Sequence, residues 1–121
     1  MTSQILKNFI ELKIKKGDVY LPSAIVLLLK NNGKATVKQI ARLIYIFENK
    51  YSLEQYETIV KNLVAVILSE YSLITVQDDT FILNVWPIKK DEVDELIKLC
   101  YQVSKGFFKN LPSQAKSLEI A

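Results

Sequence analysis

The sequence predicts a mostly α-helical protein with one β-hairpin. Four stretches of the 121-residue chain place apolar residues at the three- and four-residue spacing of an amphipathic helix. They lie on both sides of two short runs that are rich in β-branched and other apolar residues, and turn residues separate these two runs as in a hairpin. The chain holds only three glycines and three prolines, and this scarcity favours helices over many strands and turns.

The N-terminal part is expected to form two helices. Apolar spacing predicts a helix over residues 3–15, with Ser3 as its cap and Gly17 after its end. Residues 18–22 form a connector, because their proline disfavours a helix at the residue before it. The strongly apolar residues 23–30 follow as a short buried helix, and a buried strand is the alternative for this run.

Two capping boxes mark the starts of the next two helices. Residues 36–39 begin a helix over about 37–48, and residues 52–55 begin a third helix over about 53–70. At 100° per residue, the core face of this third helix is expected to consist of Tyr56, Val60, Leu63 and Ile67.

The spacing changes after the third helix. Residues 73–76 and 81–85 predict the two strands of the hairpin, with residues 77–80 as its turn. A last helix is expected over about 92–108, with Asp91 as its cap.

The composition excludes most kinds of enzyme and metal site. The sequence has no histidine, which removes the commonest general base and metal ligand. Its single cysteine, Cys100, can form neither an internal disulfide nor a thiolate zinc site. A cluster of carboxylates at the start of the last helix complements the helix dipole, and metal binding is the less favoured reading of Asp91, Glu92, Asp94 and Glu95. We expect neither an enzymatic activity nor a cofactor.

No segment predicts a membrane span or a secretion signal. The longest uncharged apolar run, Leu21 to Leu29, is much shorter than the ~20 residues that cross a bilayer. The N-terminus has no basic region followed by an apolar core. Together with the lone thiol, these features lead us to expect a cytoplasmic protein that does not bind membranes.

Charge is unevenly distributed along the chain, whose net charge is +3. Residues 1–50 carry nine basic and three acidic side chains, a net charge of +6. Residues 51–88 carry one basic and five acidic side chains, a net charge of −4, and residues 89–121 have a net charge of +1. The first half therefore suits an anionic partner, whereas the middle of the chain would repel one.

Three short helices followed by a hairpin resemble a winged-helix domain. About half of the chain carries this resemblance, in the segments Ser23 to Asn31, Thr36 to Glu48, Ser52 to Glu70 and Leu73 to Val85. In that family the third helix lies in the DNA major groove, and the hairpin, or wing, contacts the backbone or minor groove. The resemblance divides the chain into an N-terminal helix (1–17), a winged-helix core (18–86), a C-terminal helix (87–111) and a flexible tail (112–121).

The stretch from Tyr20 through Val37 to the wing is also similar to winged-helix modules of archaeal proteins. Some of those modules are fused to nucleases of the His-Asn-His type. This chain has no histidine, so the resemblance does not imply a nuclease activity here.

The winged-helix resemblance implies two sets of DNA contacts. Thr58, Lys61 and Asn62 face away from the predicted core of the third helix and suit base edges in the major groove. Lys34, Lys38 and Arg42 lie before or along the second helix and suit phosphates. An ordinary solvated helix face is the alternative for both sets. Acidic neighbours on the third helix and at the wing tip oppose DNA binding, namely Glu54, Glu57, Asp78 and Asp79.

The N- and C-terminal helices are additions to the minimal winged helix, and each carries an apolar stripe. The two stripes either pack on each other or pair between two copies of the chain. For a homodimer, the expected interface residues are Ile5, Phe9, Val93, Leu96, Cys100 and Val103.

These features lead to two functional hypotheses. The first is a small protein that binds double-stranded DNA, as a dimeric winged-helix transcriptional regulator. The second is a winged-helix module that binds another protein and does not bind DNA. The acidic third helix and wing favour the second hypothesis.

Overall fold

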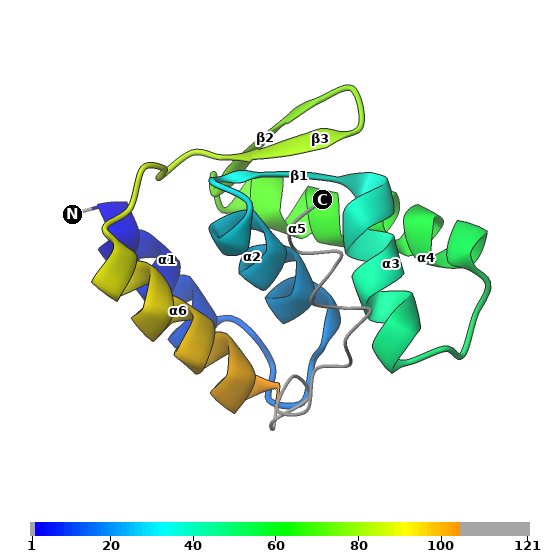
Figure 1. The fold of residues 1–121 in the computed structure, drawn as a ribbon, viewed down its shortest axis with the longest axis horizontal. Coiled ribbons are helices and arrows are strands. Elements are labelled where there is room, and N and C mark those ends of the chain that lie inside the picture. Colours follow the sequence, from blue (N-terminus) through cyan, green and yellow to red (C-terminus); the bar gives the residue numbers. More distant parts are fainter. Residues whose placement is uncertain (1, 105–121) are drawn as a thin grey trace.

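The computed structural model describes residues 2–104 as a mostly helical protein with a small antiparallel sheet (Figure 1). This confirms the prediction of a mostly α-helical protein with a β-hairpin. The helices are α1 (Thr2–Leu12), α2 (Tyr20–Lys30), α3 (Val37–Phe47), α4 (Leu53–Ile59), α5 (Ala65–Glu70) and α6 (Lys90–Val103), and a π-helical turn, η1 (Val60–Val64), joins α4 to α5. The strands are β1 (Lys34–Thr36), β2 (Ile74–Gln77) and β3 (Thr80–Leu83).

The sheet has the strand order β1-β3-β2, and both pairings are antiparallel. Strands β2 and β3 form the predicted hairpin, with Gln77 opposite Thr80. Strand β1 was not predicted, because three residues are too few to show a period and this strand forms only by pairing with the distant β3. The order of helices and strands is compatible with a winged-helix-like fold.

Helix α2 forms the centre of the hydrophobic core. All nine residues from Leu21 to Leu29 are buried, and α2 contacts α6, α3 and β1. The helix begins at Tyr20, three residues earlier than expected. The Asp18 carboxylate accepts hydrogen bonds from the backbone N–H groups of Tyr20 and Leu21, at 3.3 and 3.1 Å. Pro22 is tolerated because it lies in the first turn, where its missing N–H has no partner to lose.

Helices α4 and α5 and the turn η1 form one third helix, Leu53 to Glu70, with a π turn in its middle. Within this turn the Ala65 N–H donates to the Val60 carbonyl five residues back, instead of four. The turn therefore accommodates one more residue than an α-helical turn, and the side chains that follow it are rotated relative to a regular helix.

The predicted core face of the third helix is partly wrong because of the π turn. Leu63 was expected in the core and is 43% exposed, and Ile67 is only partly buried. The buried side chains instead follow one another at steps of four residues, as Tyr56, Val60, Val64 and Leu68. A regular α-helix would drift by about 40° at each such step, and the wider π turn keeps the stripe on one face.

Helices α1 and α6 lie side by side next to α2 (Figure 1). Ser3 does not cap α1: its Oγ donates to Glu92 Oε1 at 2.6 Å and links the first turns of these two helices. Helix α6 begins at Lys90, so Asp91 lies in its first turn and not at its cap. The expected end of the C-terminal helix and the tail 112–121 lie outside the described residues.

Candidate functional site

Helix α3, the third helix and the hairpin carry the residues predicted to contact DNA. Helix α3 packs against α4 and η1, and the strand β1 immediately precedes it. All six candidate side chains are exposed, namely Lys34, Lys38, Arg42, Thr58, Lys61 and Asn62. Lys38 and Arg42 are one turn apart on α3, and Lys34 lies on β1. We call Lys34, Lys38 and Arg42 the basic stripe.

The two capping boxes predicted from the sequence are present. Thr36 Oγ1 accepts from the Gln39 N–H at 3.1 Å, and the Gln39 side chain accepts from the Thr36 N–H at 2.9 Å. Ser52 and Gln55 make the same reciprocal pair, at 3.1 and 2.8 Å. These bonds fix the starting points of α3 and of the third helix, and thereby the positions of the candidate residues on them.

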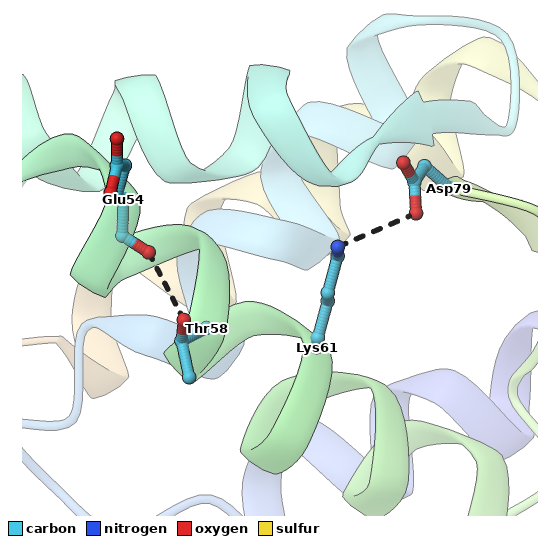
Figure 2. A network of polar contacts seen from close by, with 4 residues as sticks. All are labelled: Glu54, Thr58, Lys61 and Asp79. Atoms are coloured by element: carbon cyan, nitrogen blue, oxygen red, sulfur yellow. Dashed lines mark hydrogen bonds and ion pairs between the residues drawn. The ribbon is translucent and has the colours of Figure 1, made fainter.

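An ion pair links the third helix to the hairpin turn (Figure 2). Lys61 Nζ lies 3.9 Å from Asp79 Oδ1, and the two side chains are 52% and 65% exposed. A pair this exposed contributes little to stability. It nevertheless partly offsets the positive charge of Lys61, the one cation among the predicted groove contacts on the third helix.

The other groove candidates have different surroundings. Thr58 Oγ1 donates to the Glu54 backbone carbonyl at 3.1 Å, so its hydroxyl proton is used within the helix and its oxygen remains an acceptor (Figure 2). Asn62 is exposed within the π turn. Of the three, Asn62 has the amide group that best matches adenine.

The acidic wing tip is anchored to the start of α3. Its two-residue turn consists of Asp78 and Asp79, and Asp78 has a left-handed backbone with φ of 56°. The Val37 N–H donates to the Asp79 carbonyl at 2.8 Å. The carbonyl of the turn therefore occupies one of the free N–H groups at this helix N-terminus, and the two carboxylates are held near the beginning of the basic stripe.

A cluster that the sequence did not predict joins α2, the end of α3 and the third helix, and of its side chains Tyr56 is buried while Tyr20 and Glu48 are partly buried. The hydroxyls of Tyr20 and Tyr56 both donate to Glu48 Oε2, each at 2.8 Å. The Tyr56 oxygen also accepts from the Lys50 N–H at 3.0 Å, and its ring is fully buried. We call Tyr20, Glu48 and Tyr56 the Glu48 cluster. Its members are too far apart in sequence for any periodicity to reveal it.

The Glu48 cluster raises the pKa of both tyrosines. Burial is the larger cause in each case, because it disfavours the phenolate. The hydrogen bond to Glu48 adds to the effect, since a carboxylate acceptor favours the protonated phenol. Tyr45 and Tyr51 place their rings edge-on to Tyr56, at 6.2 and 5.6 Å between centroids, and are about two-fifths to one-half exposed.

Three of the six residues predicted for a homodimer are buried inside the single chain. Phe9, Leu96 and Cys100 are buried where α1 and α6 pack, and burial raises the pKa of the Cys100 thiol. These three side chains are buried within one chain, so they offer little surface to a second copy. Val93 and Val103 are partly buried, and Ile5 is 52% exposed.

The described part of the chain has neither a metal-binding cluster nor a membrane-spanning helix. No group of three or more histidine, cysteine, aspartate or glutamate side chains within residues 2–104 is arranged to hold a metal ion. Among the same residues, no helix has the length and apolar character needed to cross a bilayer. In comparisons with known proteins, the sequence matches no family model and no curated protein, and the structure matches no solved structure.

Proposed function

We propose that this chain is a winged-helix protein that binds double-stranded DNA. The observation that carries the proposal is the joint exposure of two polar sets, one on β1 and α3 and the other on the third helix. Helix α3 and the third helix pack against each other next to the hairpin. The topology adds support, because the short β1 lies between the first two core helices and the hairpin follows the third, as in winged helices.

In this proposal the basic stripe contributes most of the affinity. Lys34, Lys38 and Arg42 bind phosphates, and Thr58 and Asn62 face base edges. Lys61 exchanges its carboxylate partner Asp79 for a phosphate when DNA binds. Three phosphate contacts predict a slope of log K against log salt of about −2.7, and Lys61 as a fourth contact predicts about −3.6.

The test is fluorescence anisotropy with a labelled duplex of mixed sequence, titrated at several salt concentrations. Lys38→Glu/Arg42→Glu should weaken binding and make the salt slope about 1.8 shallower. Lys89→Glu/Lys98→Glu makes the same change of charge at the N-cap and on the surface of α6 and should have a much smaller effect. Equal effects of the two variants, or no binding at low salt, would contradict the proposed interface.

The ion pair gives a second variant with an opposite expectation. Asp79→Asn removes a carboxylate close to the proposed phosphate path and releases Lys61. It should therefore strengthen duplex binding several-fold, most clearly at low salt. Asp91→Asn, at the start of α6, is the matched control and should leave the affinity unchanged.

The first hypothesis from the sequence, a dimeric transcriptional regulator, requires that the protein form a homodimer in solution. Sedimentation equilibrium tests this requirement, and Ile5→Asp is the informative variant because Ile5 is the most exposed of the predicted interface residues. A shift of the variant towards monomer supports the dimer, and a monomeric wild-type protein opposes it.

A protein-binding module is the second candidate, and the acidic surface of the third helix and wing favours it. Glu54, Asp78 and Asp79 are exposed, and the nearby Lys61 is paired. Such a surface fits a basic protein partner better than a phosphate backbone. Asp78→Lys/Asp79→Lys should abolish retention of a basic protein partner, and it should strengthen binding if the ligand is DNA. The two candidate functions therefore predict opposite changes in affinity for this variant.

A further inference from the structure

An open cleft of about 440 Å³ lies between the loop after α1 and the π turn of the third helix. Lys13, Lys15 and Lys16 line it from the loop, and Leu63 and Ile67 line it from the third helix. Its volume is within the ~300–1,000 Å³ of ordinary small-molecule sites. The cleft is separate from the basic stripe, none of whose residues lines it.

The three lysines give this cleft a cationic side. Within residues 2–104, none of the three ammonium groups is in an ion pair. The acidic residue in the lining, Asp18, directs its carboxylate to the N–H groups at the start of α2. The loop is held in place, because the Gly17 N–H donates to the Val103 carbonyl at 2.7 Å and Gly17 takes a left-handed φ of 91°.

The apolar side of the cleft is a consequence of the π turn. A regular α-helix would direct Leu63 to the core, as the spacing of the sequence predicts. The π turn exposes 43% of this side chain and buries Val64 in its place. π turns within α-helices are frequent at functional sites, and here the exposed leucine lies opposite three cations.

We propose that this cleft binds a small organic anion with an apolar body, such as a medium-chain carboxylate. The carboxylate would lie among Lys13, Lys15 and Lys16, and the hydrocarbon would cover Leu63 and Ile67. The mixture of cations and exposed apolar surface favours an amphiphilic anion over an inorganic anion, which gains nothing from the apolar wall, and over a neutral hydrocarbon, which gains nothing from the lysines. This site does not depend on the proposed DNA binding.

The test uses the fluorescent anion 8-anilinonaphthalene-1-sulfonate as a probe of the folded protein, with sodium decanoate as competitor. We expect saturable binding of the probe, displacement by decanoate and no displacement by decanol at equal concentration. Lys15→Glu/Lys16→Glu and Leu63→Ser should each weaken binding by about tenfold or more, which corresponds to about 1.4 kcal/mol. Lys38→Glu/Arg42→Glu is the matched control for charge and should change binding by less than about twofold.

Amide shifts in heteronuclear NMR spectra decide where the ligand lies. Decanoate should move the resonances of Gly17, Leu63 and Ile67 and leave that of Lys38 in place. The proposal is overturned if decanol competes as well as decanoate, if the control variant loses as much binding as Lys15→Glu/Lys16→Glu, or if the folded wild-type protein does not bind the probe. Circular dichroism of every variant establishes that binding is compared between folded proteins.

Discussion

Removing one hydroxyl from the Glu48 cluster should destabilise the protein more than its small size suggests. Tyr56→Phe keeps the fully buried ring and its edge contacts with the neighbouring tyrosines. It removes the hydrogen bond to Glu48 Oε2 and leaves the Lys50 N–H without its acceptor. The change therefore isolates the polar contribution of this side chain.

The expected loss follows from the two bonds. A hydrogen bond to a charged group contributes about 1.5–3 kcal/mol and a neutral one about 0.5–1.5 kcal/mol. Glu48 is only partly buried and keeps the Tyr20 hydroxyl, so water compensates part of the first bond. We therefore expect Tyr56→Phe to lower the free energy of unfolding by about 2–3 kcal/mol.

Urea denaturation followed by circular dichroism measures this loss. Tyr20→Phe removes one bond to the same carboxylate and should cost less, and Tyr51→Phe, whose ring is 46% exposed, should cost less than about 0.5 kcal/mol. The double variant Tyr20→Phe/Tyr56→Phe should cost more than the sum, because Glu48 then lacks both phenol donors. A change below about 0.5 kcal/mol for Tyr56→Phe would refute the assigned role.

Three further perturbations test other parts of the structure. In the Glu48 cluster the folded protein keeps tyrosine protons that the unfolded chain releases above about pH 10, because the pKa of each tyrosine is raised in the folded state. The free energy of unfolding should therefore fall as the pH rises above about 10, by at most about 1.4 kcal/mol per pH unit for each tyrosine. Urea denaturation should show a less steep fall for Tyr20→Phe. Gly33→Ala should cost more than about 2 kcal/mol in the same assay, because φ is 86° and the new Cβ would lie 2.6 Å from the Trp86 ring. Deleting Asn62 from the π turn should change the thermal midpoint little, because the turn contains one residue more than a regular helical turn. Deleting Arg42 from the regular helix α3 should unfold the protein. Equal losses of stability in both deletions would refute the assignment of an extra residue to the π turn.

Features with a local cause could be predicted from the sequence. The capping boxes at Thr36 and Ser52 depend on residues three apart, and both form as expected. The hairpin depends on two short runs and the turn between them. The exposure of the candidate DNA contacts also followed from local spacing, because a polar side chain opposite an apolar stripe has little chance of burial.

Features that depend on tertiary contacts could not be predicted in this way. Strand β1 exists only through its pairing with β3, forty-odd residues later. The Glu48 cluster joins three elements that approach one another only in the folded chain. The pairing of Lys61 with Asp79 likewise depends on how closely the hairpin approaches the third helix. Counting charges along the sequence showed that this region is acidic, but it did not show that Lys61 pairs with Asp79.

The π turn explains both the wrong core assignment and the location of the proposed cleft. The third helix contains two possible apolar stripes, which share Tyr56 and Val60. One continues with Leu63 and Ile67, and the other continues one residue later with Val64 and Leu68. A regular helix would bury Leu63, whereas the π turn buries Val64. The stripe left outside is the one that faces the three lysines of the loop. The same turn carries Lys61, so the proposed anion site and the proposed DNA interface share the segment of the third helix whose hydrogen bonding departs from the α pattern.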